Sequence, residues 1–426
     1  MSTATMKENR FYLIVLILSG LGIIFLVIQG LTLALVLSAS AMLEEMDATQ
    51  WLPMSTLAWS SILVGLLLTP TFMISLKHYQ RKPLPTWLNL ERSTLRKWVV
   101  GLVLVWPLLV WLGYWLVGKP TLAAFSLGIL NFLVVGIPIL LILTVARSKL
   151  DGGSKFRQWG LFGFSLTVMP AIIMLAEIAA ILILVLFGGV WLAYRISIDP
   201  TIERELGYLM DQVMIGGQDP EALLQLLKPY ILQPSVIVLA SVIFGGLIPM
   251  IEELLKPIGL WFVAGKKLSP QEGFVGGLLC GAGFAFLENL LYFSMAFTPE
   301  DWLFMAIGRA GTGVLHMLGS GLIGWGLAKA WRDGKGLALG ITLISAFIFH
   351  GLWNVLALIV GVAPLVVEGL DTTLWKTLTL NLPVIFMLIL SVAVLLGLRR
   401  RVKRESVQSM GGDDVLLLGE EGRPAS

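Results

Sequence analysis

Charged residues are scarce in this 426-residue chain, where Asp, Glu, Lys and Arg together make up 13% of the sequence. A soluble globular domain carries about 25% charged residues, so this composition excludes an ordinary soluble protein. Hydrophobic residues reach 57% instead. We therefore expect a multi-pass integral membrane protein, with the lipid bilayer around most of the chain.

Cysteine and histidine are also rare. Cys280 is the single cysteine, which excludes an intramolecular disulfide. The chain has three histidines, and none of them forms an HExxH helix of the zincin type. No nucleic-acid-binding signature occurs, because the basic clusters lie between apolar segments, where the orientation of membrane spans accounts for them.

Long apolar runs are abundant, and about ten of them reach the roughly 20 residues that a helix needs to cross the hydrocarbon core. Because the bilayer offers the backbone no hydrogen bonds, the sequence predicts an all-α, polytopic transmembrane helix bundle of about ten spans. We place the spans near residues 11–38, 54–76, 98–117, 121–146, 159–194, 234–264, 273–297, 302–330, 337–362 and 376–398.

The segments between these runs alternate in charge. One set is rich in Lys and Arg, as at 77–97 and 399–404, and the other is acidic or poor in positive charge, as at 44–47 and 300–301. Cytoplasmic loops carry the excess of Lys and Arg in membrane proteins. The alternation therefore predicts that both termini lie in the cytoplasm.

Five ionisable residues interrupt the later apolar runs: Glu252, Glu253, Glu288, His316 and His350. A charged side chain near mid-membrane costs about 2.5 to 3.5 kcal/mol on insertion scales, so such residues are rare without a function. Four of them, one on each successive span, lie about 14 to 16 residues from the polar end of that span, which is roughly 21 to 24 Å of helix. We therefore expect one shared polar cavity, which is the candidate active site.

Polar neighbours share helix faces with these residues. Lys256 follows the two adjacent glutamates by three and four residues, where an intrahelical ion pair lowers the cost of burial. Asn354 lies four residues after the last histidine, and Arg309 lies seven before the middle one. Asn289 and Tyr292 follow the third glutamate within about one turn. We expect all five to support the site.

Four motifs in this region resemble those of PrsW-type intramembrane proteases, a family related to the CAAX prenyl endopeptidases. Residues 252–256 are similar to the family's EExxK motif, and residues 284–289 are similar to its FxxxEN motif. His316 and the segment 350–354 are similar to its two later histidine motifs. The resemblance covers roughly residues 235–362, and we carry no function onto the first 230 residues.

The resemblance implies an intramembrane endopeptidase that hydrolyses membrane-anchored proteins, such as an anti-sigma factor or a similar regulator. It further implies location in a bacterial cell membrane, with the lipid bilayer and a protein substrate as partners and no nucleic acid. The wider superfamily has been described both as metalloproteases and as glutamic-type proteases. The cofactor is accordingly zinc or none.

The residues suit hydrolysis on chemical grounds as well. Either Glu252 or Glu253 would activate water as a general base, and Lys256 would hold the other. His316 and His350 would either stabilise the oxyanion, assisted by Asn354, or bind a metal, and Glu288 completes the cluster. For zinc, the candidate ligands are Glu253, Glu288, His316 and His350.

Other functions remain compatible with parts of this pattern. A proton- or cation-coupled transporter would also place carboxylates and histidines at mid-membrane, although it would favour internal repeats, which we do not find. A rhomboid-like serine protease could use Ser320 with His350, but the GxSG spacing is missing. A non-catalytic scaffold would not need the full cluster.

We expect four parts along the chain. They are transmembrane helices of unassigned role at 1–195, an extracytoplasmic amphipathic connector at 196–233, the PrsW-like protease core at 234–398, and a basic, disordered cytoplasmic tail at 399–426.

Overall fold

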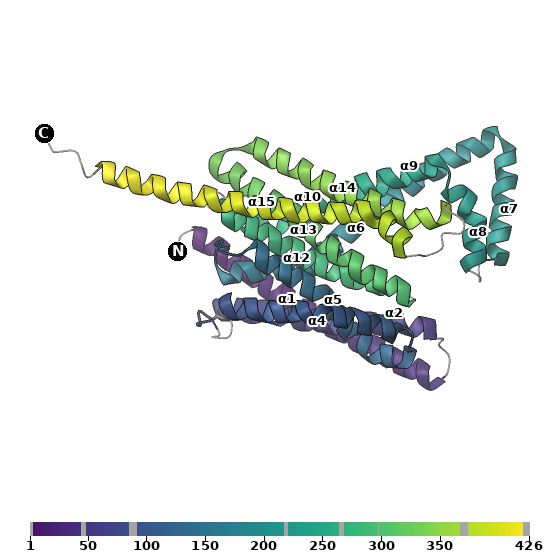
Figure 1. Ribbon diagram of the computed structural model, residues 1–426, viewed down its shortest axis with the longest axis horizontal. Coiled ribbons are helices and arrows are strands. Elements are labelled where there is room, and N and C mark those ends of the chain that lie inside the picture. The colour runs from purple at the N-terminus through teal and green to yellow at the C-terminus, as the bar shows by residue number, and fades with distance from the viewer. Residues whose placement is uncertain are drawn as a thin grey trace. The chain divides into compact units, whose positions relative to one another are not determined.

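The computed structural model describes residues 3–43, 48–84, 92–216, 220–263, 268–296, 298–366 and 374–420, and these residues form helices joined by turns and short connectors. No strand occurs among them, so the all-α prediction is confirmed. Figure 1 labels most of the helices in chain order. Their bounds are α1 (Thr3–Leu43), α2 (Ala48–Leu67), α3 (Thr69–Tyr79), α4 (Arg92–Val117), α5 (Pro120–Ala146), α6 (Lys155–Ile198), α7 (Pro200–Gly216), α8 (Pro220–Ile231), α9 (Pro234–Val242), the π-helix η2 (Ile243–Leu247), α10 (Ile248–Leu255), α11 (Ile258–Val263), α12 (Pro270–Phe293), α13 (Pro299–Asp333), α14 (Gly336–Val366) and α15 (Leu374–Glu420).

Nine stretches of the described residues are long and apolar enough to cross a membrane, which confirms a multi-pass membrane protein. They correspond to nine of the ten expected spans. The tenth, expected at 302–330, is α13, which has 35 residues but is not among the nine. Every residue from Gly311 to Ala328 is buried, and a helix enclosed by protein does not need the apolar surface of one that faces lipid. The crossing of α13 and the side on which the termini lie stay predictions.

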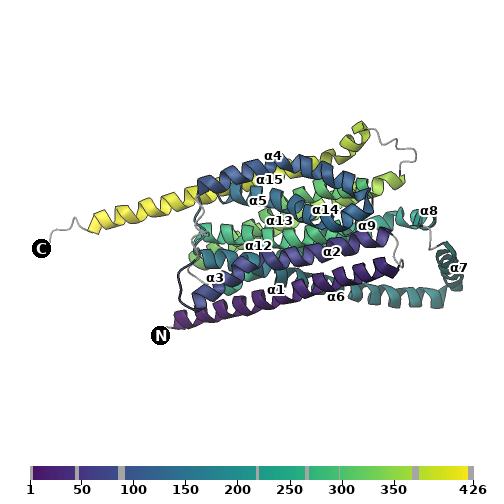
Figure 2. The same cartoon turned by 90° about the horizontal axis from the view of Figure 1, so that it is seen from below.

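The chain divides into two compact units, and the first contains Met1–Pro170, Glu253–Ala346 and Leu388–Ser426. Within it, α5 packs against α2, α4, α12 and α13, and α1 packs against α2 and α3 (Figure 2). The most extensive packing is between α12 and α13. This pair carries five of the ten expected site residues, so its geometry decides how they meet.

Glycines on α12 let it approach α13 with backbone in contact. Gly273, Gly277 and Gly281 repeat every four residues and so lie on one helix face. A side chain at Gly277 would collide with the backbone of Ser320, and one at Gly281 would collide with that of His316. Small residues at this spacing are typical of close packing between membrane helices. The seam therefore fixes the backbone of His316 against the helix that also carries Glu288.

This seam gives a stability prediction for Gly281→Ala. The added methyl carbon would lie 2.7 Å from the carbonyl carbon of His316 and 2.8 Å from Cα of Met317, and neither backbone atom can move without separating the helices. We expect a loss of about 1–3 kcal/mol, measured by unfolding of the purified protein in detergent. Gly308→Ala on α13 is the matched control, because no atom beyond its neighbouring residues and its own helix backbone lies within 4 Å of its added carbon. Equal stability of the two variants would contradict this account of the seam.

Local sequence signals define where α12 and α13 begin. Ser269 and Glu272 form a capping box at the start of α12, and Thr298 and Asp301 form another at the start of α13. Gly334 ends α13 in the left-handed conformation, with φ of 68°, which glycine adopts without strain. These residues thus determine where α12 begins and where α13 begins and ends.

The second unit contains Ala171–Glu252 and Phe347–Met387. Its α7 and α8 fall in the range 196–233 where we expected a connector, and they contact each other. In η2, the carbonyl of Phe244 accepts a hydrogen bond of 2.9 Å from Nδ2 of Asn354 on α14. A π-turn disturbs the regular helix ladder, and such turns are frequent at functional sites. Asn354 therefore supports the segment that leads directly into α10.

The domain boundaries and the cytoplasmic side of the tail stay predictions. Within the range 399–426, where we expected disorder, α15 continues as a helix to Glu420. Residues 421–426 lie outside the described residues.

Candidate functional site

The acidic pair on α10 is buried together with the lysine that follows it. Glu252 is 5% exposed, Glu253 is 1% exposed and Lys256 is fully buried. A buried ammonium is stable only when it is paired and hydrogen-bonded. The contacts of Lys256 therefore explain how this segment tolerates burial.

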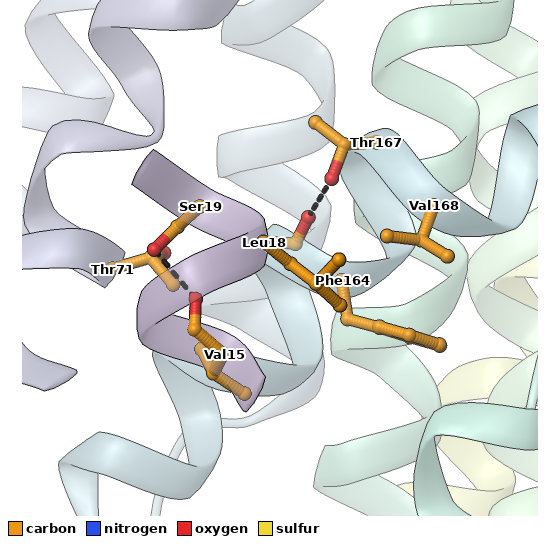
Figure 3. A pocket seen from close by; sticks show the side chains of 8 residues that line it. Val15, Leu18, Ser19, Thr71, Phe164, Thr167 and Val168 are labelled. Atoms are coloured by element: carbon orange, nitrogen blue, oxygen red, sulfur yellow. Dashed lines mark hydrogen bonds between the residues drawn. The ribbon is translucent and has the colours of Figure 1, made fainter. Parts of the chain in front are cut away.

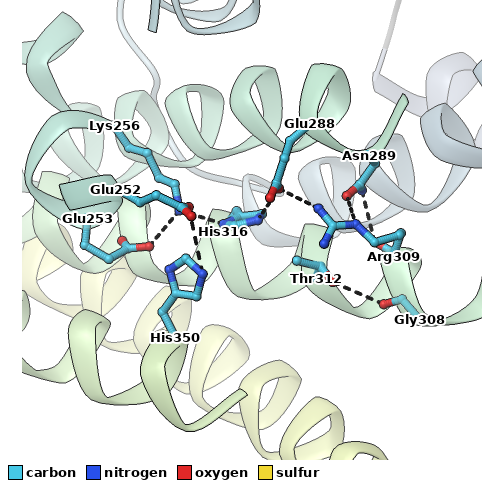
Figure 4. Close-up of polar contacts among 10 residues, drawn as sticks. All are labelled: Glu252, Glu253, Lys256, Glu288, Asn289, Gly308, Arg309, Thr312, His316 and His350. Carbon is cyan, nitrogen blue, oxygen red and sulfur yellow. Dashed lines mark hydrogen bonds and ion pairs between the residues drawn. The ribbon is translucent and has the colours of Figure 1, made fainter. Parts of the chain in front are cut away.

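Lys256 joins α10 to α13. Its Nζ lies 2.8 Å from Oε1 of Glu253 and 2.7 Å from Nδ1 of His316 (Figure 4). The same Nζ lies 4.6 Å from the ring centre of Phe284, a favourable cation–π distance. An ammonium group can only donate hydrogen bonds, so Nδ1 of His316 accepts and Nε2 carries the ring proton.

His316 in turn contacts α12. Its Nε2 lies 2.7 Å from Oε2 of Glu288, and the same oxygen lies 2.7 Å from a terminal nitrogen of Arg309. Figure 4 shows these side chains in a row from Lys256 through His316 and Glu288 to Arg309. Along this row, the Lys256 ammonium contacts a neutral imidazole, and the Glu288 carboxylate lies between that imidazole and the Arg309 guanidinium. No two like charges are therefore neighbours in the row.

In the second unit, His350 lies beside Glu252. Their nearest atoms, Nε2 and Oε2, are 3.8 Å apart, and both side chains are buried. This distance is too long for a direct hydrogen bond. We expected Asn354 to assist at an oxyanion, but its amide nitrogen binds the Phe244 carbonyl instead.

One group of buried residues has the composition of a metal site. Glu252, His316 and His350 are all buried, and each offers one ligand atom to a metal. Two imidazoles and one carboxylate are the donor set of several catalytic zinc sites, so the residues fit a divalent metal. Our expected ligands were Glu253, Glu288, His316 and His350, and they did not include Glu252. In the structure, Glu253 forms an ion pair with Lys256. Glu288 contacts His316 and Arg309.

Two contacts near Glu253 were not evident from the sequence. The aromatic ring of Phe284 lies beside Lys256. Phe284 is the first residue of the FxxxEN motif, and this was the feature of the sequence that could have indicated a role in the site. Gly319 on α13 makes room for the Glu253 carboxylate, since a side-chain carbon at Gly319 would lie 2.5 Å from Oε2. Because α13 contains several glycines, sequence alone does not distinguish this role from helix packing.

Two other features carry no comparable chemistry. Ser320 is fully buried, and among the described residues its hydroxyl has no hydrogen-bond partner, so no histidine activates it as a nucleophile. A small cleft between α1, α3 and α6 contains Ser19, Thr71 and Thr167 (Figure 3). All three hydroxyls donate to backbone carbonyls. The cleft therefore offers mainly apolar surface.

Comparison with known proteins identifies the part of the chain that carries the site. Residues 214–394 match the family described as PrsW family intramembrane metalloprotease. The match includes α10, α12, α13 and α14, and thus all ten expected site residues. Neither the curated proteins nor the solved structures give a match. Together with the membrane-spanning helices and the buried glutamate and histidine cluster, the match identifies residues 214–394 of this multi-pass membrane protein as a PrsW family intramembrane metalloprotease domain.

Proposed function

We propose that this chain hydrolyses peptide bonds of membrane-anchored protein substrates, with a metal held by Glu252, His316 and His350 and with Glu253 as the general base. The observation that carries the proposal is the buried group of one carboxylate and two imidazoles. The family match favours proteolysis over the transport function that the buried charges alone would also allow.

The donor set determines what the site can do. When bound there, a divalent metal supplies Lewis acidity, which polarises a peptide carbonyl and makes water a better nucleophile near neutral pH. In the structure, Nδ1 of His316 contacts Lys256, and Nε2 contacts Glu288. Binding through Nδ1 therefore requires Lys256 to give up this contact, whereas the Glu288 contact can persist and orient the ring.

Glu253 is the better candidate for the base, because Glu252 belongs to the ligand group. The ammonium group of Lys256 favours the carboxylate form of Glu253, which is the form that accepts a proton from water. Glu253 can later deliver that proton to the departing amine. Lys256 thereby compensates the charge of the buried base.

The location of the site limits the substrate class. Glu252, Glu253, His316 and His350 are all buried in membrane-spanning helices or in the helices packed with them. A substrate whose scissile bond is anchored at the membrane can present that bond at such a depth. A single-span regulator, such as an anti-sigma factor, is the substrate class that we propose.

The test is cleavage of a single-span substrate by the full-length protein in reconstituted membranes, with metal content measured on the same samples. We expect His316→Ala and His350→Ala to lose cleavage and to lose bound zinc. Ser320→Ala should retain both, apart from small packing effects, because its hydroxyl has no described hydrogen-bond partner.

The opposite pattern would contradict the proposal. Full cleavage by both histidine variants together with loss in Ser320→Ala would indicate a serine mechanism. If no cleavage occurs and proton flux depends on Glu253 and Glu288, the buried charges serve transport instead. Cleavage that survives complete removal of metal would leave the protease but overturn the ligand assignment.

A further inference from the structure

Arg309 on α13 binds three side chains of α12 at once. A terminal guanidinium nitrogen lies 2.7 Å from Oε2 of Glu288, and Nε donates to Oδ1 of Asn289 at 2.7 Å. The guanidinium carbon lies 3.9 Å from the ring centre of Tyr292. A planar guanidinium can make these contacts together, whereas the single nitrogen of a lysine cannot.

Asn289 holds Arg309 from the other direction as well. Its Nδ2 donates to the backbone carbonyl of Arg309 at 3.0 Å, while its Oδ1 accepts from the side chain. Asn289 is 1% exposed, and both ends of its amide are engaged. The guanidinium therefore has a fixed position relative to α12, which makes it a rigid anchor rather than a mobile surface charge.

Glu288 connects this anchor to His316. The same oxygen, Oε2, contacts both Arg309 and Nε2 of His316. The Glu288 side chain is 20% exposed, so burial alone does not hold its carboxylate in one orientation. Two described contacts select the tautomer of His316, one at each ring nitrogen. Without Arg309, the carboxylate can turn away from Nε2, and the contact of Nδ1 with Lys256 would remain.

We propose that Arg309 is a positioning residue that fixes the tautomer of His316 through Glu288. Arg309 holds Oε2 where it accepts the Nε2 proton, and Nδ1 then remains the acceptor nitrogen that faces Lys256. The effect on cleavage rests on the proposed function, in which Nδ1 of His316 would bind the metal. The tautomer itself is a property of contacts within one unit of the chain.

The scarcity of histidine makes a direct test practicable. The chain contains His78, His316 and His350, so selective ¹⁵N labelling of histidine gives three imidazoles in the spectrum of the full-length, metal-free protein in detergent. The His316 signals are assigned by their loss in His316→Gln. We expect wild type to show a protonated Nε2 and an unprotonated Nδ1 for His316.

Arg309→Ala loosens the contact at Nε2 and leaves the one at Nδ1, so it should populate the second tautomer in part and lower kcat for cleavage about 10- to 100-fold, with KM nearly unchanged. Arg309→Lys should shift the tautomer in the same direction, because a lysine cannot hold Glu288 and Asn289 together. It also keeps the positive charge, so it decides the question if the alanine variant does not fold. Gly308→Ala should match wild type in both measurements, since no atom beyond its neighbouring residues and its own helix backbone lies within 4 Å of its added carbon.

A wild-type His316 spectrum in Arg309→Lys, or in folded Arg309→Ala, would overturn the proposal whatever the activity. Failure of the proposed function is a separate result. It would appear as full cleavage in His316→Ala, while the effect of Arg309 on the tautomer could still be observed.

Discussion

Glu253→Gln is expected to lower kcat for cleavage about 10²- to 10⁴-fold, the usual contribution of a general base. Gln has the size of Glu and retains an oxygen that can accept from Lys256 Nζ, which lies 2.8 Å from the carboxylate in the structure. It cannot take a proton from water. The variant should therefore keep its fold and its bound zinc but cleave more slowly. Single-turnover cleavage and zinc content measure the two effects.

Glu252→Gln is the matched comparison, because it changes the neighbouring residue of the same pair. As a member of the proposed ligand group, Glu252 should affect metal content as well as rate. If Glu253→Gln loses zinc while Glu252→Gln keeps it, the two roles are reversed. If Glu253→Gln retains the full rate, Glu253 is not the base.

Sequence patterns named the candidate site residues, whereas the structure was needed to show how they pair. The ordered motifs on successive apolar runs located the acidic pair, Glu288 and both histidines, because charges are too costly in a bilayer to lie there at random. Helical spacing also predicted the ion pair of Glu253 and Lys256, which are three residues apart. It left the choice between Glu252 and Glu253 open, since both lie within reach of Lys256.

Contacts between helices were beyond the sequence patterns. Spacing along one helix cannot show that Nζ of Lys256 reaches Nδ1 of His316, 60 residues away. The span expected at 302–330, which is α13, is likewise not among the nine apolar stretches. Its residues from Gly311 to Ala328 are buried and include several glycines and His316. These glycines make its close approach to α12 possible.

Lys256→Met is expected to cost about 3–5 kcal/mol of stability, the typical result of removing one partner from a buried ion pair. The Lys256 side chain is fully buried and that of Glu253 is 1% exposed, so solvent cannot compensate the carboxylate that remains. Nδ1 of His316 would lose its described hydrogen-bond donor at the same time. A denaturant titration of the purified protein in detergent measures the loss in the free energy of unfolding.

The double variant Lys256→Met with Glu253→Gln separates the charge effect from lost packing. Because it removes both charges, it leaves no uncompensated carboxylate, and we expect it to be more stable than Lys256→Met alone. A cavity or packing defect at position 256 would persist in the double variant, and its stability would then be no higher. Such a result would show that Lys256 supports α10 by its volume and its contact with Phe284 rather than by its charge. The expected recovery would instead identify the ammonium as the group that allows an acidic residue to remain ionised at this depth.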